Sequence, residues 1–111
     1  MTGGQASPEV RYSRLAETLL ASPEVELARK KGFGSSALWT NGKIFVMLVR
    51  GELVVKLRRQ RVDALILAGK GRRFDPGHGR AMKEWLTVEP DHEQEWLPLA
   101  REALEFVAGR R

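Results

Sequence analysis

The sequence predicts an α+β fold in which an antiparallel β-meander packs against helices. Apolar residues recur at helical spacing near both ends of the chain, and the segments between them are rich in β-formers. Two-residue turns are expected at Asn41-Gly42, the strongest hairpin signal, and at Arg50-Gly51. The expected order is helix, four strands, helix, a short strand, a longer strand and a last helix, written α-β-β-β-β-α-(β)-β-α.

The first helix is predicted over residues 8–21. Ser7 is a good N-cap, and Pro8 suits the first helical position, where its missing N–H costs nothing. The Ser22-Pro23 step ends the pattern, because a residue before proline disfavours the helical region.

The meander follows from the two turns. If both are two-residue loops, Trp39 lies opposite Ile44 and Leu48 opposite Leu53, and directly paired residues share a face. The predicted strands span 25–30, 35–40, 43–49 and 52–57. The face expected beneath the helices carries Ala37, Trp39, Ile44, Val46, Leu48, Leu53, Val55 and Leu57. The opposite, mixed face carries Leu38, Thr40, Lys43, Phe45, Met47, Val49, Glu52, Val54 and Lys56.

The second half returns to helical spacing over 58–68, and Gly69 is a natural C-cap residue. A strand is predicted over 83–88. The last helix is predicted over 91–108, although Pro98 in a helix interior would cost about 3 kcal/mol. We therefore expect either a kink at Pro98 or a short first turn, with the helix proper starting near Leu97.

Size and composition indicate one domain, predicted over 8–109 and preceded by a disordered tail at 1–7. The 111 residues are 42% apolar and contain no cysteine, which excludes disulfides and thiol chemistry and fits a cytoplasmic protein. No apolar run reaches the length of a membrane span. The net charge of +5 is unevenly spread: residues 29–61 hold nine basic side chains and one acid, whereas 89–109 hold six acids and one base.

No motif predicts catalysis. HExxH and His-x-His spacings are missing, no GxSxG surrounds Ser35 and Ser36, and the stretch 69–85 contains no Walker A or dinucleotide fingerprint. His78 and His92 lack partners at metal-ligand spacing. The sequence therefore predicts a non-enzymatic protein without a cofactor or metal, and an enzyme is the third and least favoured hypothesis.

The stretch 69–85, "GKGRRFDPGHGRAMKEW", allows two interpretations. Its glycines and basic side chains could bind phosphate through guanidinium groups and exposed amides. Alternatively it is a structural crossover in which Phe74 fills the core and Asp75-Pro76 starts a turn. The candidate residues for nucleic-acid or anion contact are Arg58, Arg59, Arg61, Lys70, Arg72, Arg73, Arg80 and Lys83.

The mixed face of the meander is the second candidate surface. It presents apolar side chains rimmed by charge, an arrangement that on a small protein usually marks a partner surface. The alternative is that the last helix covers it. The candidate residues for a partner or homodimer face are Leu38, Phe45, Met47 and Val54.

The order of these segments resembles the TfoX N-terminal-domain-like family, which is related to the YjbR-like small bacterial proteins. The resemblance covers roughly residues 15–107 and rests on Phe33-Gly34, Asn41-Gly42-Lys43, Lys56-Leu57 and Met82-Lys83-Glu84-Trp85. Gly32 stands where the family usually has methionine, so a role of the methionine side chain does not carry over to this position.

The resemblance implies a fold like the type III secretion chaperones. Some family members are competence regulators that act with the cyclic-AMP receptor protein, and those usually carry a second, helical domain. No such domain follows in these 111 residues, so we expect a regulator's function not to carry over intact. The family supplies no catalytic residues.

These observations give two hypotheses. The first is a bacterial binding module, associated with transcription, that makes weak and salt-dependent contact with nucleic acid through its basic residues. The second is a protein-interaction or homodimerisation domain that does not bind DNA. Its partner would be a second copy of the chain or another protein, for example an acidic one.

Overall fold

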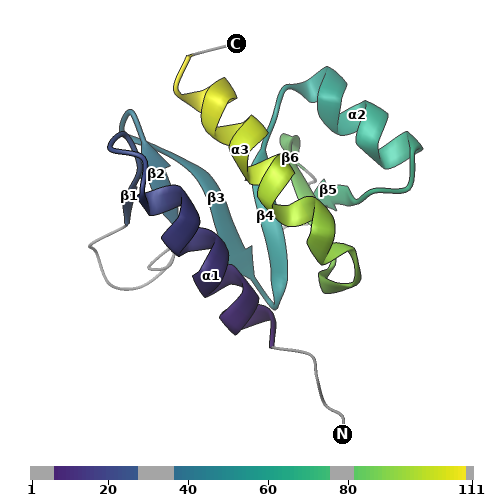
Figure 1. Ribbon diagram of the computed structural model, residues 1–111. Coiled ribbons are helices and arrows are strands. Elements are labelled where there is room, and N and C mark those ends of the chain that lie inside the picture. The colour runs from purple at the N-terminus through teal and green to yellow at the C-terminus, as the bar shows by residue number, and fades with distance from the viewer. Residues whose placement is uncertain (1–6, 28–36, 76–81, 110–111) are drawn as a thin grey trace, which may run out of the picture.

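A computed structural model describes residues 7–27, 37–75 and 82–109. Three helices pack on a six-stranded antiparallel sheet, which confirms the predicted α+β class (Figure 1). The helices are α1 (Pro8–Leu20), α2 (Arg59–Leu67) and α3 (Trp96–Val107), and a short 3₁₀ helix, η1, spans Pro90–Glu95. The strands are β1 (Glu26–Leu27), β2 (Leu38–Thr40), β3 (Lys43–Val49), β4 (Glu52–Lys56), β5 (Arg72–Phe74) and β6 (Met82–Val88).

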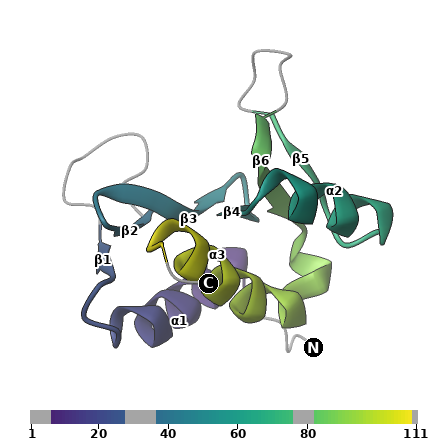
Figure 2. The same cartoon turned by 90° about the horizontal axis from the view of Figure 1, so that it is seen from above.

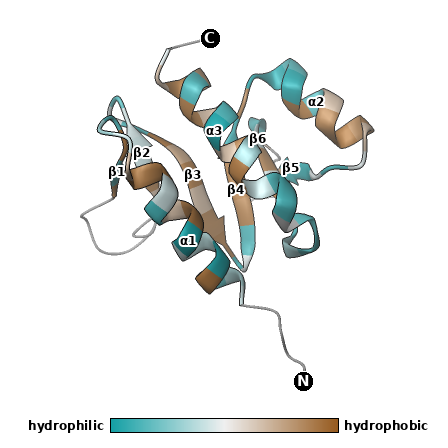
Figure 3. Cartoon of the chain, viewed as in Figure 1, coloured by the Kyte–Doolittle hydropathy of each residue, from teal (hydrophilic) through white to brown (hydrophobic). Residues whose placement is uncertain are grey.

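The strands lie side by side in the order β1-β2-β3-β4-β6-β5. Figures 1 and 2 show α1 and α3 on one face of β3 and β4, and α2 packs against β6 and β5. One hydrophobic core contains buried side chains of all three helices, together with Val55 and Leu86 of the sheet. We call this side of the sheet the helix face and the opposite side the outer face. Strands β3 and β4 are hydrophobic along most of their length, as strands between two packed faces should be (Figure 3).

Both predicted two-residue turns are confirmed. Asn41 and Gly42 have φ of 56° and 77°, and Arg50 and Gly51 have φ of 52° and 79°, the left-handed pairs that tight hairpins require. Trp39 lies opposite Ile44 and Leu48 opposite Leu53, also as predicted.

The predicted sorting of side chains between the two faces is wrong at the β2–β3 hairpin. Leu38 lies opposite Val46 although Trp39 lies opposite Ile44, so Phe45 is an extra residue on β3. Such a bulge reverses the alternation of faces on its two sides. Phe45 and Val46 therefore both belong to the core beneath the helices.

The bulge has consequences for the outer face. Ala37, Trp39 and Ile44, expected under the helices, pack instead with the outer-face cluster. Leu38 and Phe45, expected on the outer face, are completely buried on the helix face. Beyond the bulge the prediction holds. The helix-face core takes in Val46, Leu48, Leu53, Val55 and Leu57, and the outer-face cluster takes in Met47, Val49 and Val54.

The helix ends follow local rules. The Ser7 hydroxyl accepts a hydrogen bond from the Val10 amide at 3.2 Å, which confirms the predicted N-cap. At the end of α2, the Gly69 amide donates to Ile66 and the Lys70 amide to Leu65, the two bonds of a Schellman motif with Gly69 in the left-handed region.

The last helix takes the second of the two expected forms. Pro98 is the third residue of α3, within the first turn, where backbone amides have no partner inside the helix. The helix therefore needs no kink at Pro98, and η1 precedes it as a separate short turn. The short strand expected between the second helix and the longer strand is also confirmed, as β5. Parts of the first two predicted strands, and residues 76–81 of the glycine-rich stretch, lie outside the described residues.

Candidate functional site

Three of the four predicted cationic residues on or next to α2 contact other parts of the molecule. Arg61 makes two bonds to the Glu102 carboxylate of α3, at 2.7 and 3.2 Å. The Lys70 ammonium lies 3.2 Å from the Glu95 carboxylate. The Arg58 guanidinium lies over the Phe106 ring at 5.2 Å, in cation–π contact. These contacts join α2 to the C-terminal part of the chain.

The two arginines of β5 are also paired. Arg72 bonds Glu52 of β4 at 2.5 Å and Glu89, just after β6, at 3.2 Å, and Arg73 bonds Asp63 of α2. Because β5 is an edge strand, these pairs fasten it to the elements on either side. Arg80 lies outside the described residues.

Two of the predicted contact residues, Arg59 and Lys83, are exposed and have no side-chain partner among the described residues. They stand on different elements, at the start of α2 and in β6. A nucleic acid that used Arg61, Lys70, Arg72 or Arg73 would have to break an ion pair first. In the described part of the chain the predicted set does not form a continuous free cationic surface.

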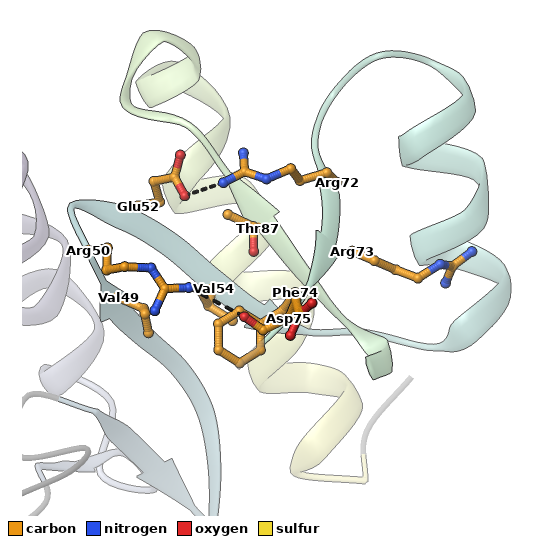
Figure 4. Close-up of a pocket in the computed structure, with 9 residues that line it drawn as sticks. All are labelled: Val49, Arg50, Glu52, Val54, Arg72, Arg73, Phe74, Asp75 and Thr87. Carbon is orange, nitrogen blue, oxygen red and sulfur yellow. Dashed lines mark hydrogen bonds and ion pairs between the residues drawn. The ribbon is translucent and has the colours of Figure 1, made fainter. Parts of the chain in front are cut away.

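A small cavity of about 120 Å³ opens on the outer face beside β5 (Figure 4). The Arg72–Glu52 pair lies on one side of it, and on the other Arg50 donates to the Asp75 carbonyl oxygen at 3.3 Å. Figure 4 shows the Arg73 side chain pointing away from the cavity. The lining of the cavity contains the carboxyl groups of Glu52 and Asp75 as well as arginines, so it is of mixed charge and is not a specific anion site.

The Arg72 pairs should contribute little to stability, because the arginine side chain is 54% exposed. We expect Arg72→Met to lower the free energy of unfolding by about 1 kcal/mol or less at low ionic strength. The loss should shrink in high salt, where surface charges are screened. Urea denaturation at two salt concentrations measures it, with Arg59→Met as the control for an unpaired arginine. A loss that is unchanged by salt would contradict an electrostatic role.

The predicted partner face is not available in a single chain. Leu38, Phe45 and Val54 are completely buried, and Met47 is 6% exposed. Leu38 and Phe45 lie beneath the helices because of the β3 bulge, whereas Met47 and Val54 are packed with Phe74 of β5. The expectation of an exposed apolar patch made by these four residues is therefore wrong.

An opening runs along α1 and has a volume of about 480 Å³, several times that of the cavity beside β5. We call it the α1 groove. It lies on the flank of α1 that faces away from α3, and a separate opening lined by Arg11, Arg14 and Trp96 marks the flank toward α3. The residues that line the α1 groove are Glu9, Tyr12, Ser13, Ala16, Glu17, Leu20, Leu27 and Leu48.

The α1 groove is apolar with an acidic margin. Leu20 of α1 is 37% exposed and Leu27 of β1 is 49% exposed, and Val10, on the same helix, is 43% exposed. Glu9 and Glu17 are exposed on the same flank of α1. Two of the five large exposed hydrophobic side chains among the described residues, Leu20 and Leu27, thus line this groove, and a third, Val10, lies on the same helix.

Tyr12 lines the α1 groove and holds α1 against the sheet. Its ring is buried, and its hydroxyl donates to the Val46 carbonyl oxygen at 3.4 Å, which fixes α1 on β3. Burial raises the pKa of Tyr12 well above its usual range, so the phenol stays protonated and keeps this donor.

The α1 groove was not predicted from the sequence. Leu15 and Leu19 are buried against the core, whereas the helix turns the neighbouring Leu20 partly outward. A signal was nevertheless present: Val10, Ser13, Glu17 and Leu20 are spaced three, four and three residues apart, a second stripe on the same helix.

The described residues hold no group of three or more His, Asp or Glu that could bind a metal ion. None of the helices in the described ranges is long and apolar enough to cross a membrane. His78 and Ser35, weighed above as catalytic candidates, lie outside those ranges.

No protein-family model, curated protein or solved structure matches this chain. The α1 groove and the paired cations therefore have to be interpreted from their own residues.

Proposed function

We propose that the chain is a non-enzymatic protein-interaction module whose binding surface is the α1 groove. The observation that carries the proposal is the concentration of exposed apolar side chains around this groove, next to two carboxylates. A surface of this kind suits an amphipathic helix, which lays its apolar side chains into the groove and places donors or cations against the carboxylates. We also propose a cytoplasmic location, which the cysteine-free composition supports.

Nucleic-acid contact is the second candidate, favoured by the net charge of +5 and the exposed Arg59 and Lys83. We rank it below protein interaction because four of the seven predicted contact residues in the described ranges are already ion-paired within the chain. The resemblance to the TfoX N-terminal-domain-like family fits an accessory role in transcription under either candidate, and it stays a prediction.

The proposal predicts binding of a model helix. The probe is a fluorescently labelled alanine-rich peptide with leucines ten residues apart and a lysine between them, and its control carries serines in place of the leucines. The chain is held at a concentration where light scattering gives the mass of a monomer. We expect the leucine peptide to bind and the serine peptide not to, by fluorescence anisotropy, because only the first can bury apolar surface in the groove.

Two matched variants locate the binding. Leu20→Lys should weaken peptide binding about tenfold, because it removes an apolar contact at the groove and adds a charge that repels the lysine. Leu67→Lys makes the same change on α2, where Leu67 is 91% exposed, and should have no effect. If the peptide does not bind, or Leu20→Lys leaves its affinity unchanged, while labelled DNA binds with a strong salt dependence, the second candidate replaces the first.

A further inference from the structure

The exposed stripe of α1 has the spacing of a helix-packing seam. Val10, Ser13, Glu17 and Leu20 are all exposed and follow one another at intervals of three, four and three residues. This is the spacing with which one helix presents a continuous edge to another. The buried residues of the same helix, Tyr12, Leu15, Ala16 and Leu19, already face the core and are not part of the seam.

The seam is complementary to itself. Its residue numbers are symmetric about Leu15, so in an antiparallel pair of α1 helices Val10 of one copy faces Leu20 of the other. In the same pair Ser13 faces Glu17, which places a hydroxyl donor opposite a carboxylate acceptor. A two-fold symmetric interface requires this kind of self-complementarity, because one surface patch has to fit a second copy of itself.

We propose that the helix in the α1 groove is α1 of a second copy of this chain, in antiparallel orientation about a two-fold axis that crosses the exposed seam midway between Ser13 and Glu17. The proposal rests on the proposed function, since it names the partner of the same groove. Leu27 and Leu48, on the sheet side of the groove, extend the apolar contact beyond the helix itself. The pairing would cover Val10, Leu20 and Leu27, which a single chain leaves exposed.

The orientation follows from charge. In a parallel pair each residue of the seam would face its own copy, so the two Glu17 carboxylates would lie opposite each other and repel. The antiparallel pair separates the two Glu17 carboxylates and places each of them opposite Ser13 of the other copy. It also opposes the two helix macrodipoles, whereas a parallel pair aligns them.

The cysteine-free sequence makes a cross-linking test clean. Ser13→Cys and Glu17→Cys are prepared as separate chains with tags of different size, mixed in equal amounts and oxidised mildly. Facing residues in the antiparallel pair have β-carbons close enough for a disulfide, so the mixed dimer should exceed each like-with-like dimer at least about tenfold. Thr18→Cys, an exposed residue of α1 outside the seam, is the control and should give only background cross-linking in every mixture.

The mass in solution is the second measurement. Light scattering should give a dimer for the unaltered chain and for Leu67→Lys, and a monomer for Leu20→Lys. If the disulfide between two Ser13→Cys chains were the main product, the antiparallel orientation would be wrong. A monomer at every concentration, without the mixed disulfide, would overturn the second copy as partner but leave the peptide result standing. A dimer that survives Leu20→Lys, with no peptide binding, would count against the α1 groove itself.

Discussion

Replacing Phe45 with alanine is expected to lower the free energy of unfolding by about 3–5 kcal/mol. The ring is completely buried beneath the helices, so its removal forfeits apolar contacts and leaves a cavity in the main core. Urea denaturation followed by circular dichroism measures the loss, at one fixed chain concentration because the proposed self-association would add to apparent stability.

Ile44→Ala is the matched control, since Ile44 is the preceding residue of the same strand. It is only half-buried and belongs to the outer-face cluster, so its loss should cost about 1–2 kcal/mol. Strict alternation along β3 predicts the reverse ranking, with Ile44 in the core and Phe45 outside. A larger loss for Ile44→Ala than for Phe45→Ala would therefore rule out the bulge.

Gly71→Ala should be the second severe change, with an expected loss of about 3 kcal/mol. A β-carbon at Gly71 would lie 2.6 Å from the Thr87 carbonyl oxygen and 3.0 Å from the nearest side-chain atom of Leu86. The carbonyl belongs to β6 and cannot swing away as a flexible side chain would. The substitution should therefore push β5 off the sheet edge, and it can be measured by the same urea titration.

Gly69→Ala, two residues earlier in the chain, is the control that distinguishes the steric clash at Gly71 from a general effect of backbone strain. A β-carbon there meets nothing within 4 Å, but the φ of 77° is unfavourable for alanine. Its cost should be about 1 kcal/mol. If both alanine variants lose the same stability, the close approach of Gly71 to β6 is not the cause.

Features that depend on a few neighbouring residues could be predicted from the sequence. The Ser7 cap, the Gly69 Schellman motif and the two left-handed turns each follow from the chemistry of two to four consecutive positions. The register of β3 against β4 follows from the second of these turns.

The candidate surfaces could not be predicted in the same way. Arg61 and Glu102 are 41 residues apart, and Arg72 and Glu52 are 20 apart, so their pairing depends on how α2, α3 and β5 pack. Four of the basic residues that look like one free cationic set in the sequence are paired with acids from other elements: Arg61, Lys70, Arg72 and Arg73. The α1 groove likewise needs β1 and β3 beside α1 before it exists.

The sequence by itself determined the fold class, the order of the elements and both hairpin turns, because turn chemistry and hydrophobic periodicity act over short distances. Only the tertiary structure decided which side chains face the helices near Phe45, which cations are free and where an apolar surface stays open. One extra residue in β3 is enough to exchange the two faces, and no glycine or proline in that strand marks its position. The physical reason is that burial is shared among elements far apart in the chain, whereas alternation is a property of a single strand.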